Sequence, residues 1–172
     1  IRTLLLSRED TPLQIIEAGI SPPWVRVTSP NGGESWGRTG VEKISWDAGD
    51  PDGDSFTYTV LYSHDEGVTW KVLDSGLTER SLEVDLDEVP GCDGSCAVRI
   101  VATDGINQAE DDSDSFFTKE KQPPTVELTS PKPVTVFPWD STVVFEAIVS
   151  DLEDPVIPKD RMTWVSDRDG FL

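Results

Sequence analysis

Two segments of the chain concentrate carboxylates in a pattern that could bind a cation. The first, "DAGDPDGDS", places Asp50, Asp52 and Asp54 among glycines and a proline that favour a tight turn. The second, "ATDGINQAEDDSD", contains Asp104 and Asp112. Crowded like charges repel one another unless a cation lies between them. Calcium suits such a group because it accepts about six to eight oxygen ligands with loose geometry.

Two readings of these acidic segments stay open. The spacing D-x-D-G-D overlaps with an EF-hand loop, but the glutamate at the twelfth loop position and the flanking helices are missing. A solvated acidic rim would use the same residues for solubility, and Asp-Gly pairs are also turn signals. A solvated rim and a calcium site both stay open, and the candidate ligands for calcium are Asp50, Asp52, Asp54, Asp104 and Asp112.

The same carboxylates do not suit catalysis. A glycosidase needs an acid and a base in a cleft, with an apolar pocket that keeps one carboxyl protonated, and a charged loop offers no such pocket. Nucleophilic catalysis has little support, because His64 is the only histidine and no nucleophile motif accompanies it. We therefore predict that the chain is not an enzyme.

The charge and hydropathy of the chain exclude two classes of partner. The formal net charge is −19, so nucleic acid and anionic membranes would be repelled along much of the surface. No segment approaches the roughly 18 apolar residues that cross a bilayer. We expect neither nucleic-acid binding nor membrane insertion.

The only two cysteines, Cys92 and Cys96, flank three turn-forming residues in "GCDGSC". A local disulfide across this turn is expected, with reduced thiols as the alternative. Zinc is disfavoured, because two thiols fall short of four ligands and His64 belongs to another predicted turn. A disulfide would indicate an extracellular or cell-surface location.

The elements that must position these groups are short strands. From Trp24 onward, alternating runs are interrupted by Gly, Pro, Asn and Asp at intervals typical of an antiparallel β-sandwich. In such a sandwich the loop after the second strand and the loop after the sixth emerge at one end, so the two acidic segments would converge. The seven expected strands are "WVRVTS", "EKISWDA", "FTYTVLYS", "VTWKVLD", "RSLEVDL", "CAVRIVATD" and "DSFFTK".

The order of features then repeats. Pro123 and Pro124 separate a sandwich over residues 24–121 from a second module over residues 122–172, in which "VELTSP" echoes "VRVTSP". The second module is incomplete, with roughly three of seven strands. Residues 1–23 are expected to be a connecting segment or the end of a preceding domain, with a strand docked along the sandwich as the rival. The acidic site would recur at Asp151, Glu153 and Asp154.

Three stretches carry a family likeness: "SPNGGESW", "ISWDAGDPDGDSFTYTVLYSHDEGVTW" and "VRIVATDGINQAEDDSD". They resemble the fibronectin type III-like and immunoglobulin-like modules of bacterial and archaeal secreted or surface proteins. The likeness covers about residues 24–121 and part of 122–172. It implies an all-β antiparallel sandwich that acts as a spacer, stalk or accessory beside a catalytic or adhesive domain. The "GCDGSC" insertion is not a general feature of these modules.

A second resemblance lies in "YSHDEGVTW", where Ser63, Asp65, Gly67 and Trp70 match the Asp-box that is repeated through sialidase propellers. A propeller needs several blades of about 40 to 50 residues, which this chain cannot supply. We therefore predict a closed hairpin turn without chemistry. In it, Asp65 would accept backbone N–H groups, Gly67 would take a positive φ and Trp70 would cover the turn.

The tryptophans suggest a rival function. Trp24, Trp36 and Trp139 could form an aromatic platform for sugar rings, whereas Trp46, Trp70 and Trp164 alternate with apolar neighbours and are expected in the core.

We expect a non-catalytic structural or spacer module of a secreted or surface multidomain protein, with calcium stiffening the joint between neighbouring domains. The alternative is a carbohydrate-binding accessory module of a secreted hydrolase, whose partner would be a polysaccharide or another surface protein.

Overall fold

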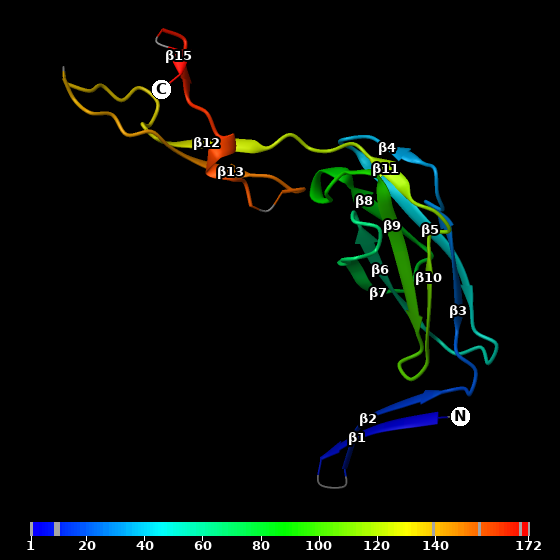
Figure 1. Cartoon of the computed structure of the whole chain (residues 1–172). Helices are drawn as coiled ribbons and strands as arrows, with labels where there is room; N and C mark the ends of the chain where they lie inside the picture. Colours follow the sequence, from blue (N-terminus) through cyan, green and yellow to red (C-terminus); the bar gives the residue numbers. More distant parts are fainter. Residues whose placement is uncertain (1, 9–10, 139, 155, 169, 172) are drawn as a thin grey trace. The chain divides into compact units, whose positions relative to one another are not determined.

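The computed structural model describes residues 2–8, 11–138, 140–154, 156–168 and 170–171 (Figure 1). The chain divides between Lys121 and Gln122 into two compact units. Strands dominate both units, and the only helical segments in the described ranges are the 3-10 turns η1 (Leu86–Glu88) and η2 (Lys159–Arg161). The prediction of an all-β protein is therefore confirmed.

The first unit begins with a hairpin that the sequence did not predict. Strands β1 (Arg2–Arg8) and β2 (Thr11–Ala18) pair antiparallel with each other. They form a two-stranded sheet of their own, and neither belongs to the sheets of the following strands.

The rest of the first unit contains two sheets. The smaller has the order β3-β5-β8 and is antiparallel. The larger has the order β4-β11-β9-β6-β7, with β10 also paired to the long strand β9 (Figure 1). The strands are β3 (Trp24–Ser29), β4 (Ser35–Trp36), β5 (Val41–Gly49), β6 (Thr57–Ser63), β7 (Lys71–Leu77), β8 (Ser81–Asp85), β9 (Cys92–Thr103), β10 (Gln108–Asp112) and β11 (Phe117–Lys119).

Strands β4 and β11 form the one parallel pair among these strands in the described part of the unit. Their backbones are joined by the N–H of Thr118 to the carbonyl of Glu34 at 2.9 Å, and by the N–H of Glu120 to the carbonyl of Trp36 at 3.1 Å. The chain therefore enters the unit in one sheet, at β3, and crosses to the other sheet at β4.

Alternating side chains of both sheets fill one shared core. In β6, Tyr58, Val60 and Tyr62 are buried, and the ring of Tyr58 meets that of Trp46 from β5 edge to face at 5.2 Å. The other buried apolar residues include Val27, Ile44, Val84, Leu86, Val98, Ile100, Ala102 and Phe117. Two sheets that share a core in this way are consistent with the predicted sandwich.

The second unit repeats the first pairing of strands. Strands β12 (Thr125–Ser130) and β13 (Glu146–Ser150) pair antiparallel, and a second hairpin joins β14 (Val165–Ser166) to β15 (Gly170–Phe171). The register is shared at a constant offset of 101 residues. The pairs Val126↔Val149 and Leu128↔Ala147 correspond to Val25↔Ala48 and Val27↔Trp46, and both ladders shift register at the same point.

The packing of this core predicts that alanine substitution of two valines on neighbouring strands lowers the free energy of unfolding by different amounts. Val60 of β6 is fully buried, whereas Val72 of β7 is 54% exposed. Val60→Ala should lower the free energy of unfolding by about 2 kcal/mol, because two methyl groups leave a packed core. Val72→Ala loses the same groups and the same strand propensity, and should change it by less than about 0.5 kcal/mol. Urea unfolding of each variant measures both values, and equal losses would contradict this core.

Candidate functional site

Three of the predicted ligands lie together at one end of the first unit. One carboxylate oxygen from each of Asp50, Asp54 and Asp104 lies within 4.8 Å of the other two. Asp50 follows β5, Asp54 precedes β6 and Asp104 follows β9, so the two acidic loops converge. All three side chains are half-buried. We call these three residues the carboxylate cluster.

Local turns hold the cluster in place. Asp50 Oδ1 accepts the backbone N–H of Asp52 at 2.7 Å and that of Asp54 at 3.4 Å. Asp104 Oδ1 accepts the N–H of Ile106 at 2.7 Å and that of Asn107 at 2.6 Å. Such turns are favoured by aspartate, whose short carboxylate reaches backbone donors two or three residues ahead. The turns therefore fix the carboxylates of Asp50 and Asp104 before any ligand is considered.

The electrostatics of Asp104 favour its ionised form. Burial opposes ionisation, but the hydrogen bonds from the backbone and side chain of Asn107 and from the backbone of Ile106 outweigh it and lower the pKa of Asp104. The side-chain amide of Asn107 donates to Asp104 Oδ2 at 2.7 Å. Asp104 consequently contributes a negative charge to the cluster at neutral pH.

Asp50 carries the feature that points to a cation. Its Oδ2 atom is buried and accepts no hydrogen bond. A buried carboxylate oxygen without a donor is costly, and two further carboxylates nearby add repulsion. A divalent cation with a preference for oxygen would relieve both costs, so the chemistry of Asp50, Asp54 and Asp104 fits calcium.

Two predicted ligands lie outside the cluster. Asp52 Oδ2 accepts the backbone N–H of Ser21 at 2.7 Å. The carboxylate of Asp112 accepts two hydrogen bonds from the guanidinium of Arg99, at 2.6 Å from Nε and at 2.8 Å from Nη2. The Arg99 guanidinium also lies over the ring of Trp70, 4.6 Å from its centroid. Asp112 therefore balances an arginine on the β9–β10 ladder.

The segment before β3 also contacts the site. The N–H of Gly19 donates to Asp54 Oδ2, and Asn107 Nδ2 donates to the carbonyl of Gly19 at 3.3 Å. A Cβ on Gly19 would overlap the carboxylate of Asp52. Only glycine fits this close approach of backbone to carboxylate.

The second unit repeats part of this arrangement. Asp151 Oδ1 accepts the N–H of Glu153 at 2.8 Å and that of Asp154 at 3.0 Å, as Asp50 does with the N–H groups of its own loop. Glu153 Oε1 accepts the N–H of Gln122 at 3.1 Å, which matches the contact between Asp52 and Ser21 at the 101-residue offset. Within the described residues, a cluster of three potential ligands occurs only in the first unit.

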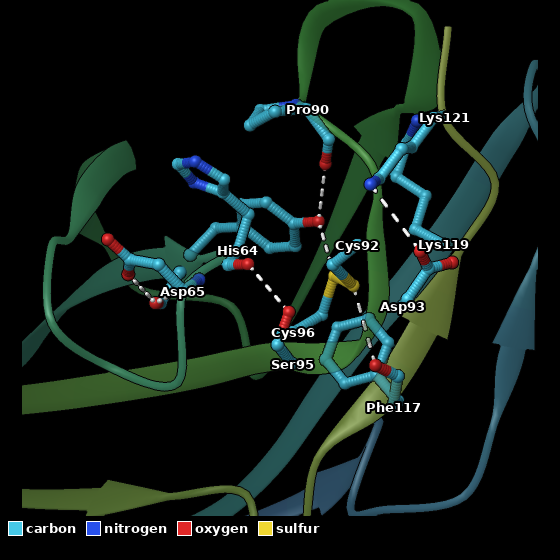
Figure 2. The surroundings of a disulfide bond; sticks show 12 residues. His64, Asp65, Pro90, Cys92, Asp93, Ser95, Cys96, Phe117, Lys119 and Lys121 are labelled. Atoms are coloured by element: carbon cyan, nitrogen blue, oxygen red, sulfur yellow. Dashed lines mark hydrogen bonds and ion pairs between the residues drawn. A yellow bond between two sulfur atoms is a disulfide. The ribbon is translucent and has the colours of Figure 1, made fainter. Parts of the chain in front are cut away.

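The cysteines form a buried disulfide (Figure 2). Cys92 and Cys96 are bonded to each other, with their Cα atoms 5.7 Å apart, so the reduced-thiol and zinc alternatives are wrong. Tyr62 packs beside them, and its hydroxyl donates to the carbonyl of Pro90 at 2.7 Å and lies 2.8 Å from Cys96 Sγ. The disulfide therefore belongs to the core between β6, β9 and β11.

The bridged turn also supports the neighbouring hairpin. Ser95 Oγ donates to the carbonyl of His64 at 2.8 Å (Figure 2). The N–H of Glu66 donates to the carbonyl of Ser95 at 2.9 Å. A serine inside the five-residue disulfide loop thus anchors the turn that carries the Asp-box residues.

The side-chain hydrogen bonds between Ser63, Asp65 and Thr69 are local to that turn. The carboxylate of Asp65 accepts hydrogen bonds from the backbone N–H of Thr69 at 2.8 Å and from the Thr69 hydroxyl at 2.7 Å. It also accepts a hydrogen bond from the Ser63 hydroxyl at 2.8 Å. The two hydrogen bonds from Thr69, with smaller help from Ser63, lower the pKa of Asp65 to about 2. Gly67 has φ +81° and lies under the ring of Trp70.

Trp36 does not belong to the rival sugar-binding platform. Trp36 is only 5% exposed and packs against Phe117 with ring centroids 4.6 Å apart, so its assignment to a sugar-binding surface is wrong. Trp46 is buried as predicted. Trp164, predicted for the core, is 37% exposed, and Trp70 is half-buried. Trp24 is half-exposed and covers Gly49, while Trp139 lies outside the described residues.

Comparisons with known proteins add no name to this site. The chain matches no protein-family model, no curated protein and no solved structure. Among the described residues, no helix has the length and apolar character needed to cross a membrane. The function must therefore be argued from the geometry.

The disulfide generates one prediction. Replacing both Cys92 and Cys96 by alanine should lower the free energy of unfolding by about 2 kcal/mol, because the unfolded chain loses the constraint of a five-residue loop. Unfolding of the wild type with and without reductant gives an independent value, and the two losses should agree. A double variant as stable as the oxidised wild type would contradict a stabilising role.

The Asp65 turn generates a prediction about pH. Because the folded pKa of Asp65 lies near 2, below its ordinary 3.8, its stabilisation is present above pH 3.8 and is lost as the pH falls through 2. Asp65→Asn should therefore cost about 1 kcal/mol of unfolding free energy at pH 7 and almost nothing below pH 2. Denaturant unfolding across this range measures the difference, and a loss that does not depend on pH would refute this assignment.

Proposed function

We propose that this chain is a non-catalytic structural module of a secreted or cell-surface multidomain protein. In this proposal the first unit is an immunoglobulin- or fibronectin III-like sandwich that calcium stabilises at the carboxylate cluster. The single observation that carries the calcium site is the buried Asp50 Oδ2, which has no hydrogen-bond donor and belongs to a side chain clustered with two further carboxylates.

The strand order supports the sandwich class. Immunoglobulin-like folds pack a sheet that contains the first, second and fifth strands against a sheet built around the third, sixth and seventh. Here β3, β5 and β8 form one sheet, and β6, β9, β10 and β11 belong to the other. The first strand of the sandwich is divided into β3, which lies in one sheet, and β4, which lies in the other. This division does not change the arrangement of the remaining strands.

The site would hold the ion with residues from both loops. Asp50, Asp54 and Asp104 would supply carboxylate oxygens, and a bound calcium ion would supply the positive charge that offsets their repulsion. Asp52 would keep its contact with Ser21 and so tie the segment before β3 to the same loop. The ion would hold the two acidic loops and the segment before β3 together as one rigid end of the unit, and this would fix the position of a neighbouring domain.

Other observations support the same class. The buried disulfide is compatible with an extracellular compartment. The burial of Trp36 removes one member of the proposed sugar platform, so the carbohydrate-binding alternative is left with Trp24 alone in the first unit. The partners in this proposal are neighbouring domains of the same protein.

The calcium site predicts a specific thermal shift. At a calcium concentration about a hundredfold above the dissociation constant, the folded first unit gains about 2.7 kcal/mol, which should raise its midpoint by roughly 5 to 10 °C over chelator. Asp50→Asn should abolish the rise, while its Oδ1 still accepts the N–H groups that form the turn. In chelator this variant should be at least as stable as the wild type, because it removes one repelling charge.

The matched control is Asp47→Asn, in the strand β5 that precedes Asp50 but outside the cluster, which should keep the full calcium response. Magnesium should give a smaller shift, because it demands near-octahedral geometry and holds its water. Terbium gives a second readout, since Trp24 covers Gly49 next to Asp50 and should sensitise its emission. Equal responses of Asp50→Asn and Asp47→Asn would overturn the site.

A further inference from the structure

The segment "GCDGSC" forms an excursion in the long strand β9. Cys92 and Cys96 pair with Lys119 and Phe117 of β11, so three residues of β9 lie opposite a single residue of β11. The disulfide closes this excursion at its base, and Gly94 within it has φ +70°. We call residues 91–96 the bridged loop.

One part of the bridged loop holds the Asp-box hairpin. Ser95 lies between the two cysteines, and its hydroxyl donates to the carbonyl of His64 at 2.8 Å. The carbonyl of Ser95 accepts the N–H of Glu66 at 2.9 Å. Both contacts are made to backbone groups of the turn between β6 and β7. The place of that turn therefore depends on a residue inside the disulfide ring.

Another part of the bridged loop holds the last residue of the first unit, Lys121. Lys121 Nζ lies 3.4 Å from Asp93 Oδ2 (Figure 2). The two backbones also approach closely, because a Cβ on Gly91 would lie 2.5 Å from the Cα of Lys121. The bridged loop thus contacts two segments that are distant in the sequence, the Asp-box hairpin and the exit of the unit.

The surroundings of the two sulfurs suit thiols as well as a disulfide. Cys92 Sγ lies 3.4 Å from the carbonyl oxygen of Phe117 (Figure 2). Cys96 Sγ lies 2.8 Å from the hydroxyl oxygen of Tyr62. A disulfide sulfur has no proton to donate, whereas a thiol is a weak donor and both oxygens can accept. Each cysteine therefore has an acceptor in place that only its reduced form can use.

The burial of the bridge decides how it can be reached. Cys92 and Cys96 are buried in the core, whereas Asp93 and Gly94 between them are exposed. A small dithiol would reach the sulfurs when these exposed residues move outward, and no strand of the core has to separate. The bridge would then change its state slowly and keep the state that it has.

We propose that the bridged loop is a redox-controlled clamp on the Asp-box hairpin and on the exit of the first unit. A dithiol reductant passes two electrons and two protons to the bridge, so that Cys92 and Cys96 become thiols and the dithiol becomes a disulfide. The thiols then donate to Phe117 and Tyr62. The loop is no longer closed at its base, and the hairpin and the exit both gain mobility.

A bridge that only stabilises the fold is the rival. It would change the free energy of unfolding without changing the motion of the folded state. The contacts of Ser95 and Asp93 favour the clamp, because they join the disulfide ring to two separate segments. The proposal does not depend on the calcium site, whose three carboxylates belong to other loops.

The test measures NMR order parameters of backbone N–H groups in the whole chain, before and after treatment with dithiothreitol. Alkylation and mass spectrometry report the state of the bridge. We expect the order parameters of Glu66, Ser95 and Lys121 to fall from about 0.85 to below about 0.6 on reduction. Those of Ile100 in the core and Asn107 beside the carboxylate cluster should stay near 0.85. Reoxidation should restore the first values.

Variants separate the clamp from the bridge itself. The double variant Cys92→Ala/Cys96→Ala should be mobile at all three positions without reductant. Ser95→Ala keeps the bridge and removes the hydroxyl contact with His64, so it should mobilise the hairpin and leave Lys121 ordered. Ser81→Ala, in β8 outside the bridged loop, is the matched control and should change neither.

Three outcomes would overturn the proposal. The first is a bridge that stays oxidised while the protein remains folded in dithiothreitol. The second is an equal set of order parameters in the oxidised and reduced proteins. The third is a loss of order at Ile100 as large as that at Lys121, which would assign the bridge to the stability of the whole unit.

Discussion

The structure depends on the contact between the two sheets of the first unit. The apolar faces of β5 and of β6 and β9 can leave water only against each other, and the edge-to-face pair of Trp46 and Tyr58 lies at their junction. Burial of these faces fixes the register of β6 against β9, because a slip of one residue would turn every buried side chain outward. That register then decides where each loop leaves the sheet, and so brings Asp50, Asp54 and Asp104 to one place. The second unit has the same opening pair of strands without that contact, and its apolar residues are correspondingly exposed.

The carboxylate cluster, the disulfide and the Asp-box turn all depend on the packing of the two sheets. The carboxylate cluster combines repulsion with a buried, undonated oxygen, which is a physical reason for a cation at this place. The disulfide and the Asp-box turn are explained by local structure, since Ser95 joins the bridged loop to the hairpin and Asp65 closes the hairpin itself. The end of the unit with the carboxylate cluster therefore has an electrostatic role. The bridged loop and the Asp-box hairpin have a structural role.

The sequence predicted the strands and the converging loops because both rest on patterns of period two and on turn residues. It failed where the answer depends on which side chain faces which. Asp112 could not be assigned to Arg99 before the β9–β10 register was known, and Asp52 could not be assigned to Ser21 without the path of the preceding segment. Trp36 was misjudged because its strand is two residues long, too short to show alternation. The β1–β2 hairpin was missed because its strands have no clear turn signal between them.

The parallel pairing of β4 and β11 has a mechanical consequence. The chain passes through β3 before it reaches β4 and leaves the unit just after β11, and β4 and β11 run side by side in the same direction. Tension applied through the two ends of the unit would pull them along their length in opposite senses. The hydrogen bonds of Thr118 and Glu120 would then be strained together in shear, where an antiparallel pair at the ends would unzip one bond at a time. A module strung between neighbours would thus resist stretching at the paired strands β4 and β11.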